Sequence, residues 1–183
     1  SAQFDISEFG SLVSLNIDGQ SSQIRLQAAG QHNVLNALAA ATCCFAIGVP
    51  VAKIVQGLEN FLPVSGRLQL KQTASGARVI DDTYNANPDS VKAAIDVLAQ
   101  SAGETTLVLG DMGEVGSEGL AFHQEIGSYA RVQGVQNLMS FGSLAQASSD
   151  AFGAGAQHYA ELDTLLASLR ACNQAGQTIL VKG

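Results

Sequence analysis

The sequence predicts an α/β fold in which a mostly parallel sheet with flanking helices follows a smaller hairpin-and-helix segment. Two observations lead to this prediction. After residue 65, short apolar strand-like runs alternate with apolar residues at helical spacing. Before residue 60, a stretch of alternating apolar and polar residues is followed by two helix-like stretches. The second part of the chain is therefore expected to be Rossmann-like.

The first part predicts a β-hairpin followed by a pair of helices. Apolar and polar residues alternate over 13–17, and the alternation resumes at Ile24 after a turn at Asp18-Gly19, which indicates a hairpin with one wet face. A nearly all-apolar helix is expected over 33–47, and a second helix begins at Pro50. Pro63, Ser65 and Gly66 favour a domain boundary, so the chain is divided into 1–64 and 65–183.

The second part predicts strands and helices in alternation. The expected strands are 67–73, 78–82, 106–110, 135–141 and 178–181, with a Ser75-Gly76 turn between the first two; the expected helices lie around 91–98, 122–129 and 162–169. Ligands bind beyond the carboxyl ends of the strands in such sheets. We expect Asp82 and Asp111 to lie at the carboxyl ends of neighbouring strands.

Composition excludes several classes of protein. Nine basic residues against sixteen acidic ones give a net charge of −7, and without a basic run no nucleic-acid partner is expected. No apolar run is long enough for a membrane span, and no secretion signal is visible. The three cysteines show no metal-binding spacing and are interpreted as buried, reduced thiols. The missing initiating Met and the apolar strand at the end indicate a segment of a longer polypeptide.

The string DDTYNANPD follows the strand predicted at 78–82, where a ligand site is expected. Asn87 is suited to cap the next helix, with Pro88 as its first residue. Helix capping does not account for the paired carboxylates, Tyr84 or Asn85. A carboxylate such as Asp82 at a strand end can accept both hydroxyls of a ribose, and polar groups at a helix N-terminus can meet phosphate oxygens.

Two further segments carry candidate residues. The glycine-rich string GDMGEVG over 110–116 permits close backbone approach to a ligand, although an ordinary surface loop is an equal alternative. His32 and Asn33 open the apolar helix and are candidates for capping it. Asn36 is costly in such a helix unless its amide has a partner, and an adenine edge would supply one.

The strings GQHNVLNALAAA, VIDDTYNANPDSVKAAI, LVLGDMGEVG and the terminal LVKG resemble the Mur ligase family along the whole chain. The resemblance implies that residues 1–64 are the end of a central ATP-binding domain and that 65–183 are most of the C-terminal ligase domain, truncated at its end. It implies a monomeric, cytoplasmic enzyme of peptidoglycan synthesis. With ATP and Mg, such an enzyme joins D-Ala-D-Ala to UDP-N-acetylmuramoyl-tripeptide through an acyl phosphate.

The resemblance also implies roles for individual residues. Asn36 would hold adenine, in a pocket lined by His32 and Asn33, and Asp82 would hold the ribose. Arg67 would act on the ATP phosphates as the catalytic cation. The remaining expected contacts are Tyr84, Asn85 and Asn87 around the cleft, and Asp111, Glu114 and Lys182 toward the dipeptide.

Several alternatives stay open at this point. Arg67 could merely begin a strand and pair with a surface acid, and Lys182 could be solvated. A folylpolyglutamate synthetase-like ligase has a similar C-terminal domain, and Asp81, Asp82, Asp111 and Lys182 also suit a phospho-acceptor receiver module. The family's P-loop is absent because no Gly-Lys dipeptide occurs in the sequence, and the metal ligands are expected mostly outside it. The segment alone is therefore predicted to be inactive.

Overall fold

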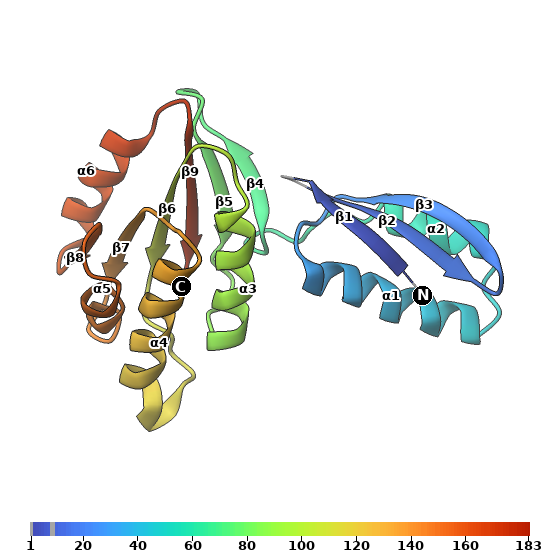
Figure 1. Cartoon of the computed structure of the whole chain (residues 1–183), viewed down its shortest axis with the longest axis horizontal. Helices are drawn as coiled ribbons and strands as arrows, with labels where there is room; N and C mark the ends of the chain where they lie inside the picture. Colours follow the sequence, from blue (N-terminus) through green and yellow to red (C-terminus); the bar gives the residue numbers. More distant parts are fainter. Residues whose placement is uncertain (1, 8–9) are drawn as a thin grey trace. The chain divides into compact units, whose positions relative to one another are not determined.

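A computed structural model describes residues 2–7 and 10–183, with side chains from residue 10 onward (Figure 1). The chain forms two compact units, Ser1–Val64 and Ser65–Gly183, which are described here one at a time as unit 1 and unit 2. Within the described residues, every helix is too short or too polar to cross a bilayer.

Unit 1 contains a three-stranded antiparallel sheet. Its strands are β1 (Ala2–Ser7), β2 (Gly10–Ile17) and β3 (Gln20–Leu26), in the order β1-β2-β3. Asp18 and Gly19 both have positive φ angles, 48° and 76°, as a two-residue turn matched to the strand twist requires. The predicted hairpin is confirmed, whereas β1 was not predicted.

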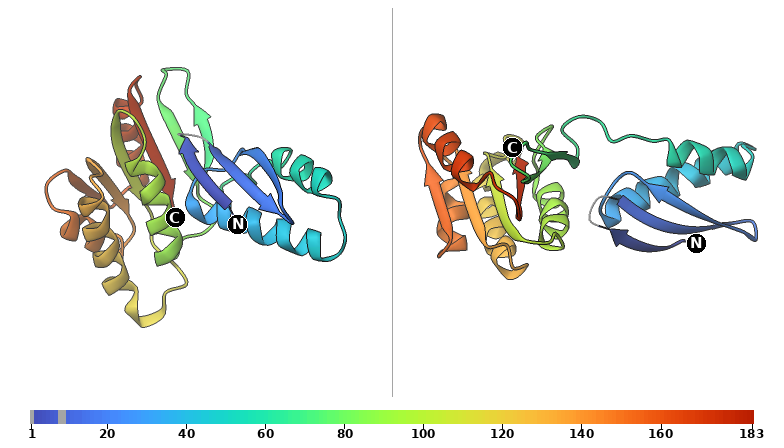
Figure 2. Two further views of the ribbon diagram at one scale, coloured as in Figure 1. Left: turned by 45° about the vertical axis from the view of Figure 1, so that its right-hand side comes forward. Right: turned by 90° about the horizontal axis from the view of Figure 1, so that it is seen from above.

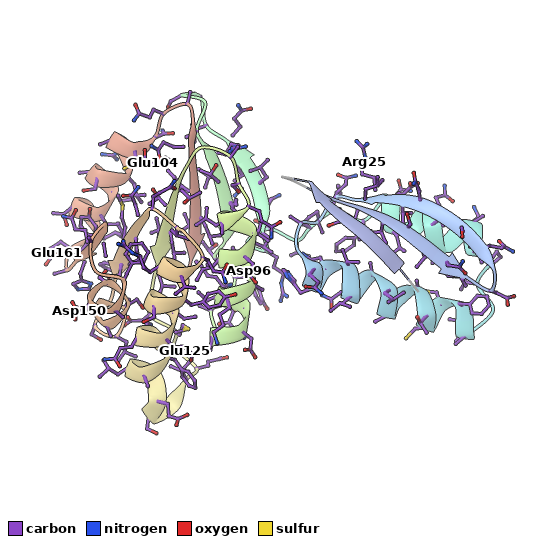
Figure 3. The ribbon with its side chains drawn as sticks, viewed as in Figure 1. Arg25, Asp96, Glu104, Glu125, Asp150 and Glu161 are labelled. Atoms are coloured by element: carbon purple, nitrogen blue, oxygen red, sulfur yellow. The ribbon has the colours of Figure 1, made fainter. Side chains whose placement is uncertain are left out.

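Both helices of unit 1, α1 (Gln31–Ala46) and α2 (Val51–Glu59), pack on one face of this sheet (Figures 1 and 2). Alternate residues of β2 and β3 point into the core that they share with the helices. The buried members of that core are Val13, Leu15, Ile24, Leu26, Val34, Ala41 and Ile54. On the opposite face Arg25 is exposed and points away from α1, so this face is wet as predicted (Figure 3).

Unit 2 contains a six-stranded sheet in the order β4-β5-β9-β6-β7-β8. Its strands are β4 (Gln69–Gln72), β5 (Arg78–Asp82), β6 (Glu104–Leu109), β7 (Asn137–Phe141), β8 (Ala156–Tyr159) and β9 (Gln177–Lys182). All pairs are parallel except β4 with β5, which form the predicted hairpin. The mostly parallel α/β sheet is confirmed. The chain passes β9 back into the middle of the sheet, between β5 and β6.

Helices cover both faces of this sheet. On one face lie α3 (Pro88–Ala99), α4 (Gly119–Val132) and α5 (Gln146–Phe152), with a short 3-10 turn, η1 (Gly116–Glu118), before α4. On the other face, α6 (Leu162–Cys172) packs through Leu165 and Leu169 onto apolar residues of the central strands (Figures 1 and 2). Two elements, α5 and β8, were not predicted from the sequence. The inward side of α5 is largely small and polar, including Ser148 and Ser149, so it gives no apolar periodicity.

Two local expectations are wrong. The first strand of unit 2 begins at Gln69, so Arg67 lies before it rather than at its start. All three cysteines are free, but Cys43 is exposed and Cys44 and Cys172 are only partly buried. The outer side of α1 is exposed although it is apolar, and Cys43 lies there with Leu35 and Phe45.

Candidate functional site

The candidate site lies at the carboxyl ends of the central strands of unit 2. Parallel pairing sets Asp82, the last residue of β5, opposite Lys182, the last residue of β9. Lys182 is in turn opposite Leu109, the last residue of β6. Asp82 and Asp111 therefore follow strands that β9 separates, and the expectation of neighbouring strands is wrong. Both strands are internal to the sheet, so their carboxyl ends still share one edge.

Asp82 and Lys182 form a buried ion pair at this edge. The Lys182 Nζ lies 2.5 Å from the Asp82 Oδ2 and donates a second hydrogen bond, of 2.9 Å, to the carbonyl of Asn85. Lys182 is only 3% exposed. A buried lysine requires such partners because an unpaired charge is costly to remove from water. The alternative of a solvated Lys182 is thereby excluded.

The segment before β4 is bound to the same edge. The second oxygen of Asp82, Oδ1, accepts a 3.0 Å hydrogen bond from the backbone N–H of Leu68. The backbone N–H of Tyr84 donates to the carbonyl of Gly66 at 3.0 Å. Between these two bonds, the guanidinium of Arg67 lies 4.2 Å from the centre of the Tyr84 ring. Arg67 is thus stacked on an aromatic face instead of beginning a strand and pairing with a surface acid.

The two asparagines that follow have local partners. The Asn87 side chain accepts from the N–H of Ser90, whose hydroxyl accepts from the N–H of Asn87, so the predicted helix cap is present as a capping box. The Asn85 side-chain oxygen accepts from the N–H of Ala86 at 2.8 Å. Both asparagines and Tyr84 are exposed, so they remain accessible beside the buried pair.

Asp81, beside Asp82 but on the other side of β5, belongs to a different pair. Its Oδ2 lies 2.5 Å from the Lys71 Nζ on the edge strand β4. The hydrogen bond from Lys71, aided by hydrogen bonds from Thr83, holds the pKa of Asp81 below its usual value of 3.8 against the opposing effect of burial. Asp81 therefore stabilises the β4–β5 hairpin, whereas Asp82 pairs with Lys182 at the carboxyl ends of the central strands.

The loop after β6 is fixed from two sides. Asp111 accepts hydrogen bonds from the N–H groups of Leu144 and Ala145, at 3.0 and 2.7 Å, and so joins the loop to the segment after β7. Glu114, in contrast, is exposed. The glycine-rich string is thus an anchored loop whose tip faces water.

His123 on α4 is a residue that the sequence analysis did not single out. It is fully buried, its Nε2 accepts from the N–H of Met112 at 3.1 Å, and its Nδ1 lies 2.6 Å from the carbonyl of Gly119. This arrangement requires a neutral ring with the proton on Nδ1. Its signal in the sequence is a polar residue three positions before Ile126, on the buried side of the helix. His123 therefore ties the loop to α4.

Two polar contacts connect α3 to α4 beside the sheet. The Tyr129 hydroxyl on α4 donates to the Asp96 carboxylate on α3 at 2.6 Å, and this hydrogen bond raises the pKa of Tyr129. Lys92 and Glu125 form a further ion pair between the two helices, at 2.5 Å. Figure 3 labels Asp96 and Glu125 on their two helices. These contacts are lateral to the strand ends and hold α3 against α4.

The candidate adenine residues belong to unit 1. The helix α1 begins after Gly30 without a side-chain cap, so the capping alternative for His32 and Asn33 is wrong. The Asn33 amide instead donates to the carbonyl of Ala29 at 2.7 Å. Asn36 is exposed, so water can satisfy its amide and the expected cost of placing it in an apolar helix does not arise.

Comparisons with known proteins agree along the chain. The family model described as Mur ligase, glutamate ligase domain, matches residues 66–183. The UDP-N-acetylmuramoyl-tripeptide--D-alanyl-D-alanine ligase of Escherichia coli (strain K12) is 38% identical over 180 residues, which are 97% of this chain and 40% of that protein. The chain thus spans well under half the length of this relative.

Solved structures share the fold. A crystal structure of MurF from Acinetobacter baumannii superposes with a TM-score of 0.89 at 32% identity, over 100% of this chain and 41% of that one. A structure of MurF from Thermotoga maritima in complex with ADP superposes with a TM-score of 0.85 at 20% identity, over 99% of this chain and 42% of that one, and shows the fold alone. With a family model that matches well over half of its residues, the chain belongs to the Mur ligase family.

Proposed function

We propose that the chain is a segment of an ATP-dependent ligase that joins D-Ala-D-Ala to UDP-N-acetylmuramoyl-tripeptide in peptidoglycan precursor synthesis. The observation that carries the proposal is the 38% identity, over 97% of the chain, to a relative named for this reaction. In this proposal, residues 1–64 are the C-terminal part of the central ATP-binding domain, and residues 65–183 are most of the C-terminal ligase domain.

The chemistry of the edge around Asp82 fits a nucleotide. Each Asp82 oxygen accepts one hydrogen bond from the chain, and a carboxylate oxygen has room for a second. Two such places are what the two hydroxyls of a ribose need. We place Tyr84, Asn85 and Asn87, all exposed, around the same ligand. On α1 of unit 1, we assign Asn36 to adenine and His32 and Asn33 to the lining of its pocket.

The metal is expected to be held elsewhere in the whole protein. Among the residues with described side chains, no three His, Cys, Asp or Glu are grouped as a cation site would need. ATP with Mg would supply the phosphoryl group that activates the substrate carboxylate as an acyl phosphate. The part of Arg67 would be to place positive charge on the phosphates, where it is most effective in a cleft closed to water.

The dipeptide is assigned to the loop of residues 110–116. Glu114 is exposed at this loop, and Asp111 is bonded into it. The amine of D-Ala-D-Ala would attack the acyl phosphate and release phosphate. The proposal places the whole enzyme in the cytoplasm as a monomer, and the present segment alone is expected to be inactive because it lacks the P-loop that cradles phosphate.

The test is made with the full-length protein that contains this chain. We expect phosphate release that depends on both UDP-N-acetylmuramoyl-tripeptide and D-Ala-D-Ala. Release with glutamate and a folate in their place would contradict the proposal and favour a folylpolyglutamate synthetase-like ligase.

Arg67 then tests the assigned role within that reaction. Arg67→Ala should lower kcat more than it raises the KM for ATP, because an interaction made mainly in the transition state is lost from the barrier. Arg67→Lys should restore part of the rate, since an ammonium lacks the forked contact of a guanidinium. A normally folded Arg67→Ala enzyme with unchanged kcat would exclude the catalytic role.

A further inference from the structure

Lys182 is more deeply buried than expected for a residue that binds substrate at an open edge of the sheet. Only 2% of its side chain is exposed, and its Nζ already has two acceptors, the Asp82 Oδ2 and the Asn85 carbonyl. An ammonium has three protons to donate. Two of the three are therefore used inside unit 2, and the aliphatic stem is buried among the strands.

The partner of Lys182 holds a strained backbone segment. The Asp82 Oδ1 accepts from the N–H of Leu68, whose φ is 46°. A branched side chain rarely adopts this left-handed conformation, which persists only where surrounding contacts impose it. The hydrogen bond from Leu68 to Asp82 is such a contact.

The same segment is held on the other side of Arg67. The carbonyl of Gly66 accepts from the N–H of Tyr84, and the Arg67 guanidinium lies over the Tyr84 ring. Lys182 also donates to the carbonyl of Asn85, the residue after Tyr84. Two hydrogen bonds thus hold the backbone on either side of Arg67. One is accepted by Asp82, which Lys182 contacts directly, and the other is donated by Tyr84, the neighbour of Asn85, whose carbonyl Lys182 also contacts.

We propose that Lys182 is a positioning residue for Arg67: by pairing with Asp82 it fixes the Leu68 N–H, and with it the left-handed turn that presents the guanidinium. This assignment replaces the one that the resemblance implied, in which Lys182 faces the dipeptide. The structural coupling stands on the contacts alone, whereas its effect on catalysis rests on the proposed function.

A second lysine–aspartate pair of the same length provides a matched control. Asp81 is the neighbour of Asp82 on β5, and its carboxylate lies 2.5 Å from the Lys71 Nζ on β4, but half of the Lys71 side chain is exposed. Besides Lys71, the Asp81 carboxylate accepts hydrogen bonds from Thr83, and not from the segment that holds Arg67. Lys71→Met should therefore leave Leu68 and Tyr84 unaffected.

The coupling is measured in this 183-residue chain by NMR-detected hydrogen exchange. The exchange rate of the Leu68 amide is divided by that of a core amide, Leu107, so that a general loss of stability cancels. We expect Lys182→Met to raise this ratio about tenfold or more, as for a partly buried hydrogen bond whose acceptor is no longer held in place. An unchanged ratio in folded Lys182→Met would overturn the proposal.

Asp82→Asn shows whether Lys182 acts through Asp82. Adding Lys182→Met to Asp82→Asn should change the ratio by less than about twofold, because the route is already broken. A larger further change would overturn the route through Asp82. If Lys182→Met alone does not fold, the double variant has no unpaired buried charge and is compared with the wild-type chain directly. A ratio equal to wild type would then count against the proposal.

Kinetics of the full-length enzyme separate positioning from substrate binding. Lys182→Met should lower kcat and leave the KM for D-Ala-D-Ala within about twofold, and its effect should not add to that of Arg67→Ala. A selective rise in that KM would make Lys182 a dipeptide ligand and overturn the proposal. If the wild-type enzyme does not ligate the dipeptide, the proposed function fails while the exchange result still decides the coupling.

Discussion

The two units bury apolar residues to different extents. In unit 1 both helices lie on one face of the sheet, and α1 buries Val34 and Ala41 but leaves Leu35 55% exposed. In unit 2 helices lie on both faces, and Leu107 and Leu180 of the central strands are fully buried. An all-apolar helix ordinarily indicates burial on every side. Within these 183 residues, burial therefore follows the number of packed layers and not the apolar composition of a helix alone.

Two helical glycines, Gly127 in unit 2 and Gly57 in unit 1, also differ in how closely their surroundings are packed. A Cβ atom built on Gly127 in α4 would lie 2.1 Å from the carbonyl oxygen of Ser148, because α4 and α5 approach closely there. A Cβ atom on Gly57 in α2 would meet nothing within 4 Å. One glycine is required by packing, and the other is only a weak point in its helix.

The largest expected effect comes from one substitution made in both units. Gly127→Ala should lower the free energy of unfolding of unit 2 by about 3 kcal/mol, because two helices must separate to admit the methyl group. Gly57→Ala should raise the stability of unit 1 by about 0.5–1 kcal/mol, because alanine has the higher helix propensity. Urea denaturation, with hydrogen exchange to assign each change to its unit, measures both. Changes of the same sign at Gly127 and Gly57 would contradict the inferred difference in packing between the two helices.

Two histidines of unit 2, His123 and His158, differ in burial and test how much a buried polar partner contributes to stability. His123→Leu should cost about 1–3 kcal/mol, because it leaves the Met112 N–H without its buried acceptor, whereas the Gly119 carbonyl keeps its hydrogen bond within the helix. Urea denaturation gives the cost, and the Met112 amide should lose exchange protection before the core does. The control is His158→Leu on β8. His158 is only partly buried and bonds Ser140, which keeps Ser149 as a partner, so this change should cost about 1 kcal/mol or less. Equal costs would mean that His123 acts only by filling space.

The smallest effect concerns the exposed pair at the edge of unit 2. The pKa of Asp81 is lowered in the folded state, chiefly by the Lys71 hydrogen bond, so its contribution to stability is present above pH 3.8 and is lost as pH falls through the folded pKa. Asp81→Asn should cost about 0.2–1 kcal/mol near pH 7. The difference in free energy of unfolding between Asp81→Asn and wild type should shrink toward zero as the pH falls below the folded pKa of Asp81. Urea denaturation across this range checks it, and a difference that grew in acid would reverse the assigned sign.

Local patterns were enough to predict most helices and strands and the strand end at which the candidate site lies. The alternation of β2 and β3, the Asp18-Gly19 turn and the Asn87-Pro88 helix start are decided by residues close in sequence. The strand end that carries Asp82 was predicted for the same reason. In contrast, α5 was missed because its small polar residues, such as Ser148 and Ser149, are buried only by contact with α4 and β7. β8 was missed because it has four residues, of which only Tyr159 is buried.

The α/β class, the hairpin, the start of α3 and the polar string at the end of β5 follow from local sequence, since each depends on backbone preferences and periodicity within a few residues. The place of β9 between β5 and β6, in contrast, follows from no local pattern and is seen only in the folded chain. That placement sets Lys182 opposite Asp82, separates Asp82 from Asp111 by a strand and buries an ion pair between residues one hundred positions apart. The physical reason is that hydrogen bonds between parallel strands fix which side chains meet, while the crossover helices leave the order of the strands undetermined by any local pattern.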